Sequence, residues 1–224
     1  MASDMGQLRD REQAGRLLAE RLSSYAGRRD VVVLALPRGG VPVAHEIARY
    51  LNAPLDIFVV RKLGVPGFEE LAMGAIAMHG AKFIETNVVE AFHIRDEVIE
   101  RVVQDERREM ARREKAYRGE RPAIDVRGRV VILVDDGIAT GSTMRVAIAA
   151  LRQLGPARVV VATGVAPLST SMLLSAEADE FVALLTPRDF RAVGQFYEDF
   201  PQLSDDDVRA LLDHSQVQNA ETAA

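Results

Sequence analysis

The stretch Val130–Thr143, VVILVDDGIATGST, constrains the fold of this chain more than any other. It opens with five apolar residues, four of them β-branched, which predicts a strand buried on both faces. Asp135 and Asp136 follow, and then a loop of small and hydroxyl-bearing residues. Beyond the loop, apolar residues recur at spacings of three and four and predict a helix: Met144, Ala147, Ile148 and Leu151.

This order of strand, acidic pair, loop and helix places groups that could bind a ligand next to one another. The loop offers backbone N–H groups and hydroxyls to an anion, and the positive end of the helix dipole adds to this attraction. Asp135 and Asp136 can accept hydrogen bonds from a ribose cis-diol, or face Mg²⁺ directly or through water. The stretch therefore predicts a site for both ends of a ribose 5-phosphate. The alternative is a buried strand and a capped helix, with both acids merely solvated.

Two further apolar runs end in candidate anion-binding residues. Val31–Leu36 leads straight into Pro37-Arg38-Gly39-Gly40, where an arginine fork matches a phosphate and two glycines allow close backbone approach. Leu55–Val60 ends just before Lys62. Because ligands of parallel α/β sheets bind at the carboxyl ends of strands, we expect these residues to converge with the acidic pair.

Strands alternate with helices along most of the chain, which favours a parallel α/β sheet with right-handed crossovers. The remaining expected strands are Ala157–Thr163 and Phe181–Leu185, and the expected helices cover about 10–27, 41–51 and 168–176. The segment Leu63–Glu70 is expected to be a turn-rich loop, followed by a hairpin of Leu71–Met78 with Lys82–Thr86.

A charged segment at about 95–117 is expected to form one helix, solvated and packed by its N-terminal half. The alternative is an oligomer contact or a cover over the site. The segment 187–200 is rich in aromatic residues, which would either stack on a flat acceptor or fill a satellite core. A short helix is expected over Asp205–Leu212, with a frayed end over the last ten residues.

The stretch Val130–Thr143 resembles the hallmark of the type I phosphoribosyltransferases: an apolar strand, two acids, a spacer, Thr-Gly and a Ser/Thr pair. The resemblance implies a parallel-sheet, Rossmann-like core with a small hood, to which this chain adds an extra charged helix. It implies that Asp135 and Asp136 bind the ribose hydroxyls of phosphoribosyl pyrophosphate and its Mg²⁺. Its implied 5-phosphate cradle is Ala139, Thr140, Gly141, Ser142 and Thr143.

The same resemblance assigns roles to the other two stretches. Arg38, Gly39 and Gly40 match the loop that binds pyrophosphate in this family. Arg38-Gly39 is similar to the Arg-Gly pair found in that loop in the adenine-type enzymes. Lys62 lies in the counterpart of the flexible loop that closes over the site, where it would neutralise the departing pyrophosphate. A plain turn at Arg38 and a solvated lysine are the alternatives.

The sequence departs from the familiar purine enzymes in two places. Ala139 stands where the hypoxanthine/guanine type has an aspartate that handles a purine proton. The adenine type places a glutamate before an aromatic-Gly pair, whereas this chain has Ala72-Met73-Gly74. Glu69 and Glu70 are the remaining candidate bases, with solvated loop carboxylates as the alternative.

Composition bounds the remaining expectations. The chain has 224 residues, 48% of them hydrophobic, which suits one domain with a core at about 30–185, the charged helix at about 94–118 and a C-terminal hood or tail at about 186–224. Absence of cysteine excludes disulfides and thiolate chemistry, and a net charge of −5 gives no general attraction for nucleic acid. Without a long apolar run or a signal-peptide pattern, we expect a cytoplasmic protein with no membrane partner.

These observations predict a phosphoribosyltransferase of nucleotide metabolism that acts as a homodimer. It would transfer the phosphoribosyl group to a small nitrogen acceptor, such as a nucleobase, by positioning and charge stabilisation. Two alternatives share the acidic loop. One is a non-catalytic regulator that senses phosphoribosyl pyrophosphate or a nucleotide, and the other is a pyrophosphokinase, for which no ATP site is apparent.

Overall fold

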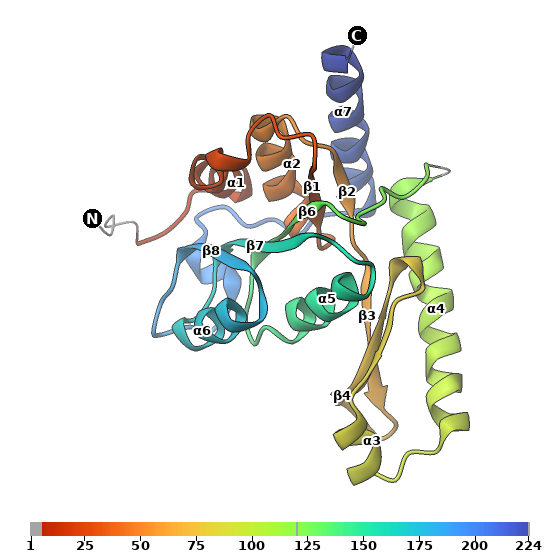
Figure 1. The fold of residues 1–224 in the computed structure, drawn as a ribbon. Helices are drawn as coiled ribbons and strands as arrows, with labels where there is room; N and C mark the ends of the chain where they lie inside the picture. The colour runs from red at the N-terminus through yellow and green to blue at the C-terminus, as the bar shows by residue number, and fades with distance from the viewer. Residues whose placement is uncertain (1–5, 120, 224) are drawn as a thin grey trace.

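The apolar run that begins at Val130 forms the middle strand of a five-stranded parallel sheet in the computed structural model, which describes residues 6–119 and 121–223 (Figure 1). In spatial order the strands are β2 (Leu55–Ile57), β1 (Val31–Ala35), β6 (Val130–Gly137), β7 (Arg158–Val165) and β8 (Glu180–Leu185). The expected parallel α/β fold is confirmed, and the register pairs Val33 of β1 with Ile132 of β6.

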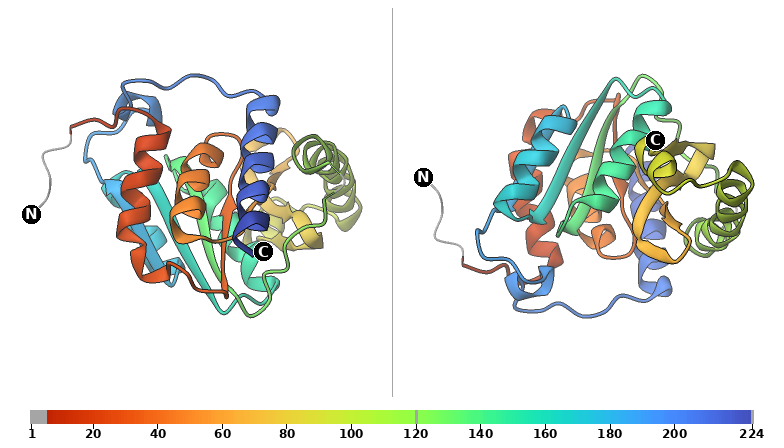
Figure 2. Two further views of the ribbon diagram at one scale, coloured as in Figure 1. Left: turned by 90° about the horizontal axis from the view of Figure 1, so that it is seen from above. Right: turned by 90° about the horizontal axis from the view of Figure 1, so that it is seen from below.

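Helices cover both faces of this sheet, as Figure 2 shows. One face carries α1 (Arg11–Arg21), α2 (Gly40–Leu51) and α7 (Asp205–Ala223), and the other carries α5 (Ser142–Gln153) and α6 (Leu168–Glu177). Asp10 begins α1 as expected, because its side chain accepts a hydrogen bond from the backbone N–H of Gln13 at 2.6 Å.

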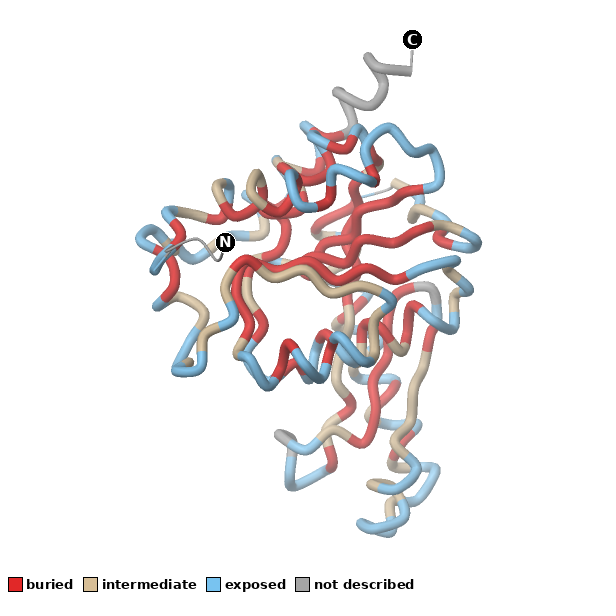
Figure 3. Tube along the Cα trace, turned by 60° about the vertical axis from the view of Figure 1, so that its left-hand side comes forward, coloured by how far each residue is buried: buried red, intermediate tan, exposed pale blue. Residues whose placement is uncertain are grey.

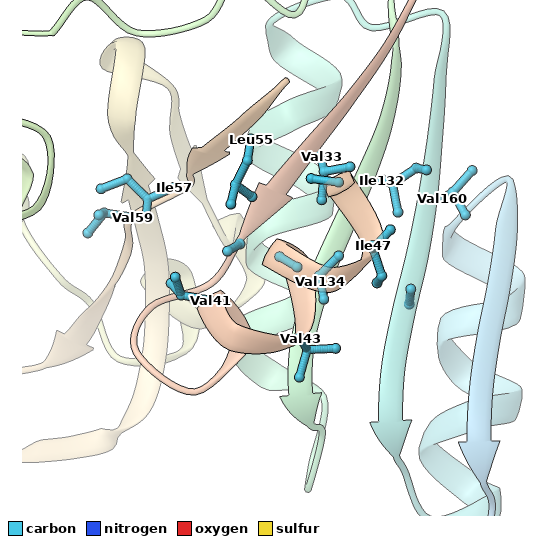
Figure 4. Packing of buried hydrophobic residues seen from close by; sticks show 14 of the residues in the cluster. Val33, Val41, Val43, Ile47, Leu55, Ile57, Val59, Ile132, Val134 and Val160 are labelled. Carbon is cyan, nitrogen blue, oxygen red and sulfur yellow. The ribbon is translucent and has the colours of Figure 1, made fainter. Parts of the chain in front are cut away.

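Strand side chains alternate between two separate cores. Val33, Ile132, Val134 and Val160 pack under α2 (Figure 4), whereas Leu133 belongs to the core beneath α5. These strands are buried on both faces, as their continuous apolar runs predict. Each such side chain contributes about 1.5–3 kcal/mol when fully buried. The long buried strands therefore provide a rigid frame for the loops at their carboxyl ends.

The chain between β2 and β6 forms a separate layer that projects from the β2 side of the core (Figure 1). This layer is named the hood and comprises residues 60–118, not the C-terminal segment at about 186–224. It contains an antiparallel sheet of β3 (Val60–Val65), β4 (Phe68–Ala77) and β5 (Lys82–Ile84), with α3 (Thr86–Ala91) and α4 (Asp96–Arg118). Figure 3 shows that exposed and half-buried segments predominate at its tip. The expected hairpin and charged helix are confirmed.

Two expectations in the hood are wrong. Leu55–Val60 is not one strand, because pairing with β1 stops at Ile57 and the chain passes into the second sheet. Leu63–Glu70 is not a loop but the turn end of a β-hairpin: the end of β3, a two-residue turn and the start of β4. Gly64 lies at a shift in its register and Gly67, with φ of 83°, in its turn, so glycines typical of loops mark a bulge and a turn here.

The two longest helices pack more extensively than expected. In α4 the apolar contacts extend beyond the N-terminal half, because Met110 and Tyr117 are buried as well as Val103. The last helix does not end at Leu212 but continues to Ala223, and it packs on α2 and α4. Within the described ranges, no helix is both long and apolar enough to span a membrane.

Candidate functional site

The acidic pair lies within β6 rather than after it. The ladder with β7 continues past the apolar run, pairing Asp135 with Thr163 and Gly137 with Val165. Because strand residues alternate, neighbouring side chains at 135 and 136 leave the sheet on opposite faces. Asp136 therefore points to the side covered by α1 and α2, where even-numbered residues of β6 pack.

Two residues from distant parts of the chain hold Asp136. Arg11 of α1 donates from Nε to Asp136 Oδ2 at 2.8 Å, and the two side chains are only 10% and 11% exposed. The hydroxyl of Tyr197 donates to the backbone carbonyl of Asp136 at 2.6 Å. Burial and the charge of Asp136 raise the pKa of Tyr197, so its hydroxyl stays protonated and remains a donor. Asp136 is thus fixed by side chain and backbone.

The neighbouring carboxylate is less tightly held. Asp135 Oδ1 accepts the backbone N–H of Asp136 at 2.9 Å. Burial and the charge of Asp136 raise the pKa of Asp135 well above its ordinary value. Among the described residues, neither carboxylate has a sealed oxygen that lacks a hydrogen-bond partner. Asp135 is half-buried and Asp136 is only 8% exposed, so little of the acidic pair is open to solvent.

The loop after β6 leads directly into the N-terminus of α5. Thr140 Oγ1 and Ser142 Oγ lie 3.0 Å apart, and both residues are exposed together with Thr143. Among the residues that the structure describes, none accepts a hydrogen bond from the backbone N–H of Ala139, Thr140 or Gly141. Free N–H groups and hydroxyls at a helix N-terminus form an anion-binding cradle.

Two contacts fix the shape of this loop. Thr170 of α6 donates its hydroxyl to the Ala139 carbonyl at 2.7 Å. Gly141 adopts φ of 79°, a left-handed conformation in which a β-carbon would lie 3.0 Å from the Thr170 side chain. The carbonyl is thereby turned toward α6, which leaves the amide side of the loop open.

The loop after β1 packs directly on the acidic pair. The Pro37–Arg38 peptide is cis. A β-carbon at Gly39 would lie 2.2 Å from Asp136 Oδ2, and one at Gly40 would lie 2.5 Å from the Val134 carbonyl oxygen. The structure thus brings Arg38-Gly39-Gly40 against β6, and the glycines make that approach possible.

Arg38 itself is 42% exposed, and its Nη1 lies 3.8 Å from Asp205 Oδ1 at the start of α7. The hydroxyl of Tyr117 donates to the same Asp205 oxygen at 3.0 Å. This open and distant ion pair leaves the guanidinium accessible to a stronger anion.

Lys62 lies in β3, opposite Ala75, rather than just past a strand end. It lines a cavity of about 490 Å³ with Thr143 and another of about 460 Å³ with Ser142. Neither cavity is lined by Arg38, Gly39 or Gly40. The structure therefore brings Lys62 to the phosphate-loop side of the site. The side chains of Glu69 and Glu70, the candidate bases, lie outside the described part of the structure.

The aromatic segment 187–200 forms a satellite core rather than an open platform. Phe196 and Tyr197 are buried, and the rings stack in pairs, Phe190 on Phe196 at 5.5 Å and Tyr197 on Phe200 at 5.0 Å. Arg11 was not among the predicted site residues, and Tyr197 was expected only as a candidate ring for stacking on the acceptor, not as a hydrogen-bond donor to Asp136. In the sequence, Arg11 is a lone arginine directly after the helix cap Asp10, and Tyr197 is one of several aromatic residues. Neither pattern predicts a contact with Asp136.

The donor set bears on the expected Mg²⁺. Within the described residues, no three acidic or histidine side chains cluster as a metal cage. A pair of carboxylates such as Asp135 and Asp136 suits a cation that keeps its waters and is held mainly by substrate phosphates, as Mg²⁺ often is. The residues therefore fit Mg²⁺ bound together with a diphosphate.

The sheet and the loops at its carboxyl edge define an α/β protein in which a strand–loop–helix unit lies beside an acidic pair. The family model described as "Phosphoribosyl transferase domain" matches residues 3–200. The chain therefore belongs to the phosphoribosyl transferase domain family.

Similar proteins agree with this membership. Two Mycobacterium tuberculosis proteins with provisional phosphoribosyl transferase names, MT0597 (strain CDC 1551 / Oshkosh) and Rv0571c (strain H37Rv), are 46% identical over 96% of this chain. The chain spans about half, 48%, of the length of each. The crystal structure of TT1426 from Thermus thermophilus is 44% identical, with a TM-score of 0.82 over 92% of this chain and 97% of that one.

Proposed function

We propose that the chain transfers the 5-phosphoribosyl group of phosphoribosyl pyrophosphate to a small nitrogen acceptor and releases pyrophosphate. The observation that supports this most is the meeting of three groups at one sheet edge. The cradle 139–143, the carboxylates of the acidic pair and the glycine-rich loop 37–40 lie around the end of β6. A 5-phosphate, a ribose diol and a pyrophosphate require those three kinds of partner.

In this proposal the free N–H groups of Ala139, Thr140 and Gly141 hold the 5-phosphate, with the hydroxyls of Ser142 and Thr143. Asp135 and Asp136 would accept hydrogen bonds from the ribose hydroxyls and would face the Mg²⁺ that accompanies the substrate. When bound, Mg²⁺ would supply positive charge to the pyrophosphate.

Arg38 would leave its long contact with Asp205 to hold the departing pyrophosphate, against the backbone of Gly39 and Gly40. Lys62, which lines cavities with Ser142 and Thr143, would add positive charge on the side of the phosphate loop. The bond from C1 of ribose to pyrophosphate breaks as the acceptor nitrogen attacks C1. Catalysis comes from positioning and from stabilising charge on the leaving group, without a protein nucleophile.

The acceptor is best sought among adenine and non-purine nitrogen compounds. Ala139 carries no group that exchanges a proton, and a general base must lie within about 3 Å of its proton or act through one water. We therefore expect weak turnover or none with hypoxanthine and guanine.

The test is pyrophosphate release with Mg²⁺ and a panel of nitrogen bases. Asp135→Asn should abolish most of the release, whereas Asp30→Asn, at the amino end of β1 and away from the site, should not change it. Hypoxanthine as the best acceptor would contradict the argument from Ala139. Tight binding of phosphoribosyl pyrophosphate without release by any acceptor would favour the sensing regulator instead.

A further inference from the structure

Arg11 is a buried cation that the proposed reaction does not use. It belongs to α1, yet its only carboxylate partner among the described residues, Asp136, is 125 positions away on β6. Charged side chains that are this deeply buried are rare unless they are paired with an opposite charge. Burying the Arg11–Asp136 pair costs desolvation free energy, and its position at the acidic pair suggests a role in the site.

The guanidinium of Arg11 is fixed from three directions. Its Nε donates to Asp136 Oδ2 at 2.8 Å, its Nη1 donates to the Pro201 carbonyl at 2.8 Å, and its plane lies 3.7 Å from the centre of the Phe200 ring. A planar fork that is hydrogen-bonded and stacked has little freedom to move. The direction of the Asp136 carboxylate is set accordingly.

The segment that holds Arg11 is itself tied to the N-terminal chain. Leu8 donates its backbone N–H to the Phe196 carbonyl at 2.8 Å and accepts that of Glu198 at 2.8 Å. Asp199 donates to the Arg9 carbonyl at 2.8 Å. Residues 8–11 and 196–201 thus form one support, which reaches the site only through Arg11 and Tyr197 among the described residues.

On its other side, the Asp136 carboxylate touches the loop after β1. The space for a β-carbon at Gly39 is filled by both carboxylate oxygens, at 2.2 and 2.7 Å. A change in the direction of the Asp136 carboxylate would therefore move its oxygens or displace the loop 37–40. Both belong to the proposed substrate site.

We propose that Arg11 is a positioning residue, which fixes the Asp136 carboxylate between the ribose and pyrophosphate subsites and so sets the affinity for phosphoribosyl pyrophosphate. This inference rests on the proposed function. Arg11 does not touch the substrate, and its effect passes through Asp136 alone.

A double-mutant cycle tests this route by calorimetric titration of the full chain with phosphoribosyl pyrophosphate and Mg²⁺. Arg11→Met should weaken binding at least about tenfold in the wild-type background, or about 1.4 kcal/mol. In the Asp136→Asn background the same change should alter affinity less than about twofold, because the group through which Arg11 acts has lost its charge. Equal losses in both backgrounds would overturn the proposal.

Arg118→Met is the matched control. Arg118 forms a second buried arginine–aspartate pair, with Asp56 at 2.9 Å, on β2 and away from the loops. Both variants should melt at lower temperature, but only Arg11→Met should bind the substrate less tightly. A similar loss of affinity in both would mean that Arg11 serves stability only.

Arg11→Lys covers the case in which Arg11→Met does not fold. Lysine keeps the charge but cannot donate to Asp136 and Pro201 as a planar fork, so its affinity should lie between those of wild type and Asp136→Asn. Wild-type affinity in Arg11→Lys would overturn the need for the fork. Failure of the wild-type chain itself to bind would instead reject the proposed function, so the two failures are distinct.

Discussion

The carboxylate of Asp136 occupies the space that a side chain at residue 39 would need. A β-carbon on Gly39 would lie 2.2 Å from Asp136 Oδ2, closer than such atoms come in folded proteins. The loop after β1 and the acidic pair on β6 therefore form one packed unit. Their relative position is part of the site, and several consequences can be measured.

Gly39→Ala should damage both the site and the fold. The added methyl must displace the loop or the carboxylate, and overpacking of this kind costs about 1–3 kcal/mol. We expect a lower melting temperature and at least about tenfold weaker binding of phosphoribosyl pyrophosphate. Gly6→Ala is the control, since nothing lies within 4 Å of a β-carbon there. Wild-type melting and binding in Gly39→Ala would refute the close contact.

Removing the charge of either acid should weaken substrate binding. Each charged hydrogen bond to a ribose hydroxyl is worth about 1.5–3 kcal/mol, so Asp135→Asn and Asp136→Asn should each lose about ten- to a hundredfold in affinity. Calorimetry with Mg²⁺ measures the loss. Unchanged affinity in both variants would rule out the assignment of the acids to the ribose.

Tyr197→Phe should destabilise the fold from beneath the site. It leaves the Asp136 carbonyl, which accepts the Tyr197 hydroxyl at 2.6 Å, without that partner. Loss of one partner of a buried hydrogen bond costs about 1–3 kcal/mol. Urea unfolding should show this decrease, while Tyr50→Phe, at a ring 53% exposed, should show almost none. Equal stability of the two variants would argue against the bond.

His45 should make stability depend on pH. Burial lowers the pKa of His45, with Arg49 and His214 acting in the same direction and Glu46 opposing them. Its Nδ1 lies 2.7 Å from Ser215 Oγ. Because the unfolded chain takes up a proton near about pH 6.5 and the folded chain only at lower pH, folding stability should fall as pH drops below that value.

The free energy of unfolding of wild type and His45→Gln, measured in urea at about pH 7.5 and about pH 5.5, tests this dependence. His45→Gln should lose less stability on acidification than wild type. His93→Asn, at an exposed histidine, should behave like wild type. An identical pH dependence in all three proteins would contradict the role of His45.

Much of the fold could be predicted from the sequence because its strands are buried on both faces. Continuous apolar runs such as Val130–Val134 are compatible with few structures other than a buried strand. Glycine or hydroxyl-bearing residues mark the loops that follow. The strands of the hood were harder to predict. Gly64 and Gly67 lie in a bulge and a hairpin turn, but glycines spaced like this are also typical of a loop.

The contacts that organise the site could not be predicted. Arg11 and Tyr197 reach Asp136 across 125 and 61 positions of the sequence, and nothing local distinguishes them from other helix or core residues. Strand alternation also directs the side chains of Asp135 and Asp136 to opposite faces of the sheet. This follows from the pairing of β6 with β7, which continues past Asp135 to Gly137. Long-range pairing decides these features, and local pattern does not encode it.

The most direct measurement of the central claim is a crystal structure of the protein with ribose 5-phosphate. The account predicts the phosphate within hydrogen-bond distance of the backbone N–H groups of residues 139–141 and of the hydroxyls of Thr140, Ser142 or Thr143. It predicts the ribose hydroxyls within hydrogen-bond distance of the carboxylates of Asp135 and Asp136. Phosphate bound elsewhere on the molecule, with the loop after β6 empty, would contradict it.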